Sequence, residues 1–214
     1  TLWMNNIYFV GLGIIGLFFV AIQYAAQAGW SSGLKRIPLA MGHWLPVAFG
    51  LTIGLWFLSN HDIFHWTHSY LYDKSSGQFD EIIDGKSPYF FWPGEAGGFP
   101  IFYIARMVIF FGMWYWFFTM IKRNMMAEDL EADTKYWFKN RSISAWFLVF
   151  FAVSSSVAAW DWVMSIDTHW FSTMFGWYVF ASWWVTALAM ITLIVVYLKD
   201  AGYLKVVNAN HLHD

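Results

Sequence analysis

Five long apolar stretches constrain the fold of this chain more than any other feature. A membrane hydrocarbon core about 30 Å thick needs roughly 20 consecutive apolar residues in a helix. Five stretches meet this requirement, and they cover residues 2–28, 38–60, 99–121, 143–166 and 171–197. Membrane-spanning strands would instead show short segments of alternating hydropathy. The sequence therefore predicts an all-α fold, a polytopic transmembrane helix bundle with five spans, which forms a single domain over residues 1–214.

The composition favours the same class of protein. Hydrophobic residues make up 59% of the 214 residues and charged residues 12%. A soluble domain of this size could not bury so much apolar surface, and the same balance excludes intrinsic disorder. The net charge of -2 includes no basic excess, so we expect no nucleic-acid partner. The absence of cysteine excludes disulfides, Fe–S clusters and covalently attached c-type haem within this chain.

The distribution of basic residues predicts how the helices are oriented. The connections after the first and third stretches and the tail after the fifth share one side, and they carry Lys35, Arg36, Lys122, Arg123, Lys135, Lys139, Arg141, Lys199 and Lys205. The long opposite connection, residues 60–98, is acidic. By the positive-inside rule the basic side is cytoplasmic, so residue 1 lies outside. Because Leu2 already begins an apolar stretch, we expect a piece of a longer subunit with further helices on both sides.

Small residues and short connections predict how the helices pack. Gly11, Gly13 and Gly16 lie together in the first stretch, and small residues of this kind let membrane helices approach each other closely. Pro46 is expected to kink the second helix or to lie in its first turns. Residues 161–182 join the fourth and fifth spans with almost no loop, which predicts a tight antiparallel hairpin.

A histidine-rich segment follows the second span. His61, His65 and His68 have the spacing i, i+4, i+7, so they share one face if the helix continues through them. Such a face at the outer surface could relay protons or bind a quinone carbonyl, and its ring nitrogens could bind a metal. The alternative without chemistry is an interfacial helix whose histidines contact water and lipid headgroups.

One charged residue lies inside the third span. Arg106 lies about 10 Å from the outer end at 1.5 Å per residue, where an unpaired charge is costly. Asp161, near the outer end of the fourth span, is its expected partner. The pair would either belong to a polar pocket or lock two helices together. Asp167 and His169 follow in the outer turn, where they could share protons with Asp161; capping of the fifth helix by Asp167 or Thr168 is the alternative.

These residues carry a resemblance to a known family. Residues 28–36, 61–68 and above all 161–182 resemble the ActF-type subunit of bacterial alternative complex III. This is its second quinone-binding-type membrane subunit, and it is related to the membrane subunits of polysulfide and nitrite reductases. The tail, residues 208–214, is also similar to that subunit. The family pattern leads us to expect proline where this chain has Thr168.

The resemblance implies a ten-helix subunit built on four-helix bundles, of which this chain would cover about half. It implies a multi-pass subunit of a respiratory quinol:cytochrome c, or quinol:electron acceptor, oxidoreductase in the bacterial cytoplasmic membrane. The subunit would contribute scaffold, a pocket for menaquinol or ubiquinol, and a proton path to the outer face. It would hold no redox cofactor of its own. Haem c and Fe–S clusters would lie in partners, which are a sister polytopic subunit, an Fe–S subunit and c-type cytochromes, with a terminal oxidase as a further partner.

The candidate quinone or proton-path residues are, by position, His61, His65, His68, Arg106, Asp161, Asp167 and His169. No metal ligand or catalytic group is assigned among them. Two other functions stay open, beside the possibility of a purely structural anchor. The first is a scaffold like subunit III of a haem–copper oxidase, which is also rich in aromatic residues and free of cofactors. The second is a secondary transporter in which Arg106 and Asp161 grip a substrate, although transporters usually have broken helices at mid-membrane.

Overall fold

The computed structural model describes residues 1–131, 133–208 and 210–211, so part of the tail noted for its resemblance lies outside the described residues. Helices are the only regular elements in those ranges. The long ones are α1 (Leu2–Ala25), α3 (Leu45–Ile63), α6 (Ile101–Glu131), α7 (Lys135–Trp162) and α8 (Phe175–Asp200). The short ones are α2 (Arg36–Met41), α4 (Glu81–Gly85) and α5 (Ser87–Phe91).

Five helical segments are long and apolar enough to cross a membrane. They cover Leu2–Ala25, Arg36–Ile63, Ile101–Glu131, Lys135–Ile166 and Phe175–Asp200. The predicted all-α, five-span bundle is therefore confirmed, and the chain is a multi-pass membrane protein. The helices α6 and α7 extend well beyond the third and fourth apolar stretches, because helix-compatible charged residues continue both helices past the apolar region.

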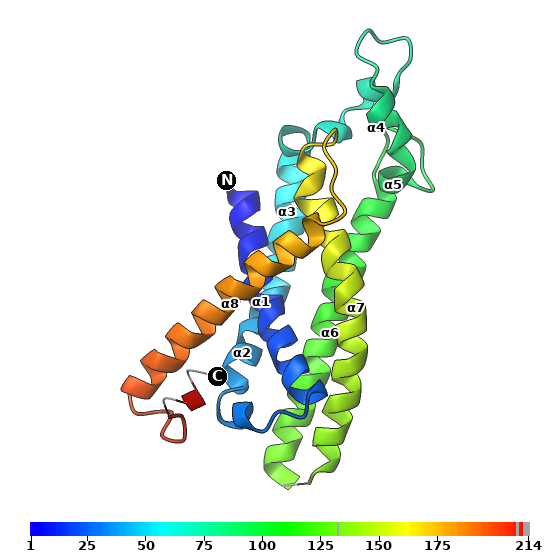
Figure 1. Ribbon diagram of the computed structural model, residues 1–214. Coiled ribbons are helices and arrows are strands. Elements are labelled where there is room, and N and C mark those ends of the chain that lie inside the picture. Colours follow the sequence, from blue (N-terminus) through cyan, green and yellow to red (C-terminus); the bar gives the residue numbers. More distant parts are fainter. Residues whose placement is uncertain (132, 209, 212–214) are drawn as a thin grey trace.

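The helix α1 lies at the centre of the bundle, where it packs against α2, α3, α7 and α8 (Figure 1). Its glycines explain this position, as the sequence predicted. A Cβ atom on Gly11 would lie 2.1 Å from the Trp183 ring of α8, and one on Gly16 would lie 2.2 Å from the Pro38 carbonyl oxygen of α2. Only glycine permits helices to approach so closely at these two positions.

The predicted tight hairpin of α7 and α8 is wrong. Residues 163–174 separate the two helices, and α8 crosses α1 and diverges from α7 toward its C-terminal end (Figure 1). The reason is aromatic packing on α1, because the Phe18 ring contacts Phe180 and Trp184 of α8 with centroids 5.2 and 5.5 Å apart. Met174 precedes α8, so neither Asp167 nor Thr168 caps it.

Pro46 lies in the first turn of α3, which is one of the two positions that the sequence allowed. Proline is tolerated there because the first backbone N–H groups of a helix have no partner within the helix.

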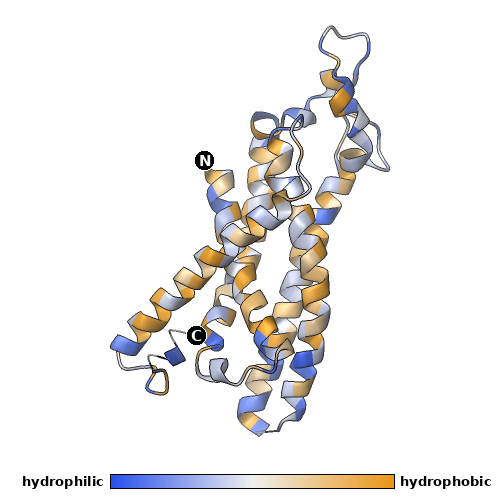
Figure 2. Cartoon of the chain, viewed as in Figure 1, coloured by the Kyte–Doolittle hydropathy of each residue, from blue (hydrophilic) through white to orange (hydrophobic). Residues whose placement is uncertain are grey.

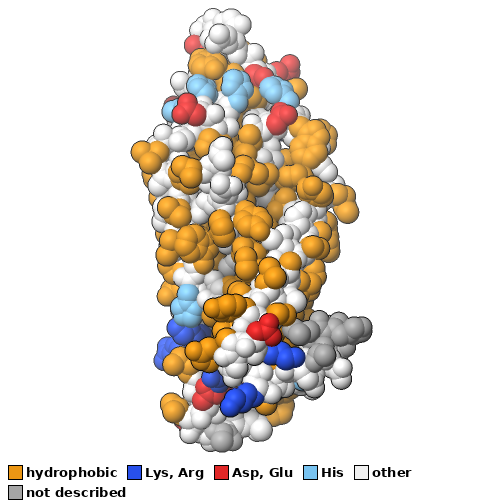
Figure 3. Space-filling model, turned by 90° about the vertical axis from the view of Figure 1, so that its left-hand side faces the viewer, with side chains coloured by type: hydrophobic (Ala, Val, Ile, Leu, Met, Phe, Trp, Pro, Cys, Tyr) orange, Lys and Arg blue, Asp and Glu red, His pale blue; other side chains and the backbone are white. Residues whose placement is uncertain are grey.

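Polar groups gather at the two ends of the bundle, with an apolar band between them (Figure 2). Figure 3 shows lysine and arginine side chains toward one end, and most of the visible histidines with acidic side chains toward the other. We refer to these as the basic end and the histidine end. The long connection that holds α4 and α5 covers the histidine end (Figure 1).

Candidate functional site

A buried ion pair joins α6 to α7 near the histidine end. Arg106 Nε donates to Asp161 Oδ2 at 2.7 Å, and Arg106 Nη2 donates to Asp161 Oδ1 at 2.9 Å. Asp161 is fully buried and Arg106 is 8% exposed. The structure thus brings together the two residues that the sequence paired, in the bidentate geometry that gives the strongest such contacts.

The same arginine also holds α5 against the bundle. Its Nη1 donates to the Tyr89 carbonyl oxygen at 2.8 Å, and its guanidinium lies 4.1 Å from the Tyr89 ring centroid and 4.5 Å from that of Phe102. Each of the three guanidinium nitrogens therefore donates to an oxygen of the protein itself. A pair so fully satisfied positions α5, α6 and α7 and does not face an open space.

The predicted cluster of Asp161, Asp167 and His169 does not form. The Asp161 side chain faces α6, whereas the connection after α7 carries the other two outward. His169 instead contacts Asp80, with 2.7 Å between His169 Nε2 and Asp80 Oδ2. The exposed Asp167 accepts from the His169 backbone N–H at 3.3 Å. The shared-proton arrangement is therefore replaced by a His169–Asp80 pair.

Asp80 is a site residue that the sequence reasoning missed. It caps α4, where Oδ1 accepts from the backbone N–H groups of Ile82 and Ile83 at 3.0 Å each. The Ile83 N–H bond, followed by the contact with His169, holds the pKa of the Asp80 carboxyl below its ordinary value. An aspartate directly before Glu81 is a helix-cap signal in the sequence, but nothing local indicates His169 as its partner.

The predicted single helical face of His61, His65 and His68 is wrong. The helix α3 ends at Ile63, and Phe64 has an extended backbone. The Thr67 hydroxyl donates to the Phe64 carbonyl at 2.8 Å and closes a short turn there. The three histidines still gather, because the His68 ring centroid lies 5.1 Å from that of His61 and 5.7 Å from that of His65.

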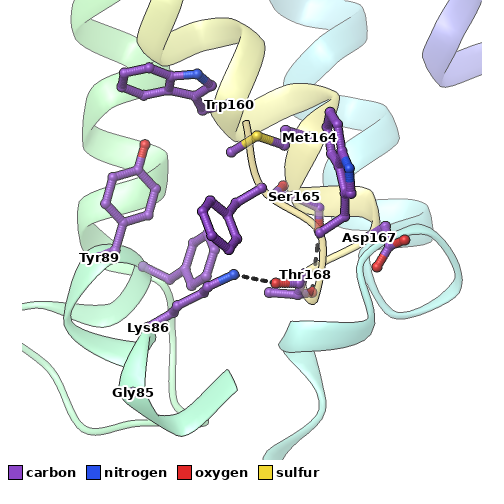
Figure 4. A pocket seen from close by; sticks show the side chains of 11 residues that line it. Gly85, Lys86, Tyr89, Trp160, Met164, Ser165, Asp167 and Thr168 are labelled. Carbon is purple, nitrogen blue, oxygen red and sulfur yellow. Dashed lines mark hydrogen bonds between the residues drawn. The ribbon is translucent and has the colours of Figure 1, made fainter. Parts of the chain in front are cut away.

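A cavity of about 370 Å³ lies between α5 and the connection after α7 (Figure 4). Most of its lining is aromatic or apolar, and the lining residues are Gly85, Lys86, Tyr89, Phe90, Trp160, Met164, Ser165, Asp167, Thr168, Trp170 and Phe171. Lys86 Nζ donates to the Thr168 carbonyl across the opening (Figure 4). The residue between Thr168 and Trp170 is His169, so the His169–Asp80 pair lies at the rim of this cavity.

The phenol of Tyr89 is a hydrogen-bond donor in the lining of this cavity. The Tyr89 hydroxyl points toward Trp160 (Figure 4). Burial, and secondly the negative charge of Asp161, raise the pKa of the Tyr89 phenol, so it stays protonated at neutral pH. The Trp160 indole N–H has no hydrogen-bond partner among the described residues, but it is buried and does not face the cavity, so Trp160 contributes only its aromatic ring to the lining. A flat, mostly apolar ligand with carbonyl or hydroxyl oxygens would match this lining, because ligand sites combine apolar walls with a few polar groups.

A smaller cavity of about 180 Å³ lies near the end of α3, and His61 and Thr67 help to line it. The seven predicted residues thus fall into three groups in the structure. They are the Arg106–Asp161 pair, the three clustered histidines, and Asp167 with His169 at the rim of the larger cavity. In the described ranges, no three or more His, Cys, Asp or Glu side chains are arranged to hold a metal ion.

A scan against protein-family models gave no match to this chain, and a search of curated proteins gave none.

Proposed function

We propose that this chain is a membrane subunit of a respiratory quinol oxidoreductase of the bacterial cytoplasmic membrane. We also propose that quinol binds in the larger of the two cavities at the histidine end, which lies between α5 and the connection after α7. The observation that carries the proposal is the cavity itself. It has flat aromatic walls from Trp160, Trp170 and Phe171, and it offers the neutral phenol of Tyr89 as a hydrogen-bond donor. A quinol head group has the same two properties, a flat apolar ring and polar oxygens on its edge.

The chain's own residues would bind the ring and receive its protons. When quinol is oxidised to quinone, two electrons and two protons leave it. The electrons would pass to haem c and Fe–S clusters of partner subunits. The protons would leave by the His169–Asp80 pair at the rim of the cavity and reach the outer surface beside the three clustered histidines. Histidine suits this step because it gains and loses a proton near neutral pH.

Arg106 and Asp161 have a positioning role in this proposal. The pair holds α5 through the Tyr89 carbonyl, and so it fixes the phenol at the wall of the cavity. The same geometry weighs against a secondary transporter. A substrate gripped by Arg106 would have to displace three hydrogen bonds to protein oxygens.

The intact complex, purified mildly from its native membrane, tests the proposal. We would record its reduced-minus-oxidised absorption spectrum and identify its subunits by mass spectrometry. A c-type haem signal, with an Fe–S subunit and a sister polytopic subunit, supports a quinol oxidoreductase. A haem a signal with copper would contradict it and indicate the scaffold of a haem–copper oxidase. A complex without haem would favour the transporter.

The cavity is tested separately by Tyr89→Phe, which removes the phenol hydroxyl and keeps the aromatic ring. One hydrogen bond contributes about 1 kcal/mol, so the KM for quinol should rise about fivefold. Tyr178→Phe, on the exposed face of α8, is the matched control and should leave KM unchanged. Equal KM values in both variants and the natural complex would contradict the binding of quinol in this cavity.

A further inference from the structure

A third hollow, larger than the two cavities described above, lies toward the basic end of the molecule and has no part in the proposed function. It is a groove of about 440 Å³ between α6 and α7, in the half of these helices nearer to their connection. We call it the α6–α7 groove, and its lining residues are Met113, Trp116, Phe117, Met120, Ile143, Trp146, Val149 and Phe150. All eight are apolar or aromatic. Trp146 is 70% exposed and Val149 is 66% exposed, so no described part of the chain covers the groove.

On each of the two helices, the apolar face that lines the groove ends at a basic residue. On α6, Met113, Trp116 and Met120 follow one face of the helix, and the next position on that face is Arg123. On α7, the face that carries Ile143 continues four residues back to Lys139. The two charges thus lie where the apolar lining ends, toward the basic end.

The two basic residues also lie at the same height and on the same side. Asn124 Nδ2 donates to Asn140 Oδ1 at 2.8 Å in the interface between the helices, which fixes their register. Arg123 and Lys139 each precede one of these asparagines. In a helix, each residue is rotated by about 100° from the one that follows it. Because α6 and α7 are antiparallel, this rotation places the residues before the two asparagines on the same side of the helix pair. The lining residues Trp116 and Phe150 lie on that side by the same helical spacing.

These two charges have no acidic partner among the described residues. Their neighbours at the basic end do have partners. Lys135 pairs with Glu131 at 2.6 Å, and Lys122 Nζ lies 2.7 Å from His43 Nε2. The carboxylate of Glu131 is therefore already neutralised. Arg123 and Lys139, at the end of the apolar groove, are available to bind an anion from outside the chain.

We propose that the α6–α7 groove is a binding site for an anionic phospholipid, with an acyl chain along the apolar lining and the phosphate at Arg123 and Lys139. The lining suits a hydrocarbon chain, because all eight residues are apolar or aromatic and the indole N–H groups of Trp116 and Trp146 are the only hydrogen-bond donors on their side chains. The paired cations suit a headgroup phosphate, as basic sites between transmembrane helices do on the cytoplasmic side. An apolar partner helix would leave both charges without a counter-ion, which is costly near a membrane.

Native mass spectrometry of the full chain in detergent tests this site. The chain is titrated with dioleoyl phosphatidylglycerol and, separately, with dioleoyl phosphatidylcholine, which has the same chains and no net charge. We expect tighter binding of the anionic lipid. The double variant Arg123→Gln/Lys139→Gln should weaken that binding on the order of tenfold and leave the neutral lipid unchanged. The double variant Lys199→Gln/Lys205→Gln removes as much charge near the C-terminal end of α8 and should change neither.

A second variant keeps the test independent of the charges. Val149→Trp fills the α6–α7 groove from its exposed side and should weaken both lipids, with the thermal unfolding of the lipid-free chain unchanged. Equal binding of the two lipids by the natural chain would overturn the proposal. An equal loss of anionic-lipid binding in the two double charge variants would also overturn it. Such a result would indicate a diffuse electrostatic attraction to the basic end and no specific site.

Discussion

Replacing Asp161 with asparagine should destabilise the bundle strongly, because it leaves a buried positive charge without its counter-ion. Arg106 is 8% exposed and Asp161 is fully buried, so water cannot take the place of the carboxylate. The change weakens the two charge-assisted bonds at 2.7 and 2.9 Å and keeps the third bond to Tyr89. Breaking a buried pair by removing one partner costs about 3–5 kcal/mol, and we expect Asp161→Asn to fall in this range.

A double-mutant cycle distinguishes the ion pair from simple loss of packing. The variant Arg106→Gln/Asp161→Asn removes both charges and keeps two side chains that can bond to each other. Its cost should be lower than that of Asp161→Asn alone, by about 1–3 kcal/mol. The assay is reversible unfolding in mixed micelles, followed by circular dichroism as the denaturing detergent is increased. Costs that add across the two sites, or an Asp161→Asn cost below about 1 kcal/mol, would refute the reasoning.

Two other changes test the helix packing around α1 and the electrostatics of the histidine end. Gly16→Ala would place a Cβ atom 2.2 Å from the Pro38 carbonyl oxygen and should cost about 1–3 kcal/mol in the same unfolding assay. Gly54→Ala, which meets open space, is its control and should leave the bundle as stable or slightly more so; an equal loss in both would show that close helix approach is not the cause. For Asp80, the folded pKa lies below the ordinary 3.8, so its carboxylate stabilises the fold above that pH and this contribution is lost as pH falls through the folded pKa. The difference in melting temperature between the natural chain and Asp80→Asn should therefore shrink below pH 3.8, and a difference that is constant from pH 6 to 2.5 would contradict it.

The sequence predicts those features of the fold that the lipid bilayer imposes. Hydropathy indicates five spans, because each must satisfy the length of a bilayer crossing. The cost of a charge in that environment leads from Arg106 to Asp161. Gly11 and Gly16, which have no side chain, indicate the face of α1 that other helices approach. Each of these inferences concerns a single helix, or one charged residue and its oppositely charged partner.

Features that depend on several elements could not be predicted in this way. The divergence of α8 follows from Trp183 and Trp184 packing on α1, and no local pattern specifies that surface. The His169–Asp80 contact joins positions 89 residues apart in the chain. The helix α3 is already kinked at Ser59 and ends at Ile63, just before the turn that the Thr67 hydroxyl closes, so the i, i+4, i+7 spacing of the histidines was misleading. The larger cavity exists only because residues 85–90 lie against residues 160–171.

The most direct test of the central claim is photoaffinity labelling of the intact complex with an azido-substituted quinone, followed by peptide mapping. We expect label in residues 85–90 and 160–171 of this chain, the two segments that line the cavity between α5 and the connection after α7. An excess of unlabelled quinol should suppress it. Label confined to a partner subunit, or spread over the lipid-facing helices and unaffected by competing quinol, would contradict the claim that this cavity holds quinol.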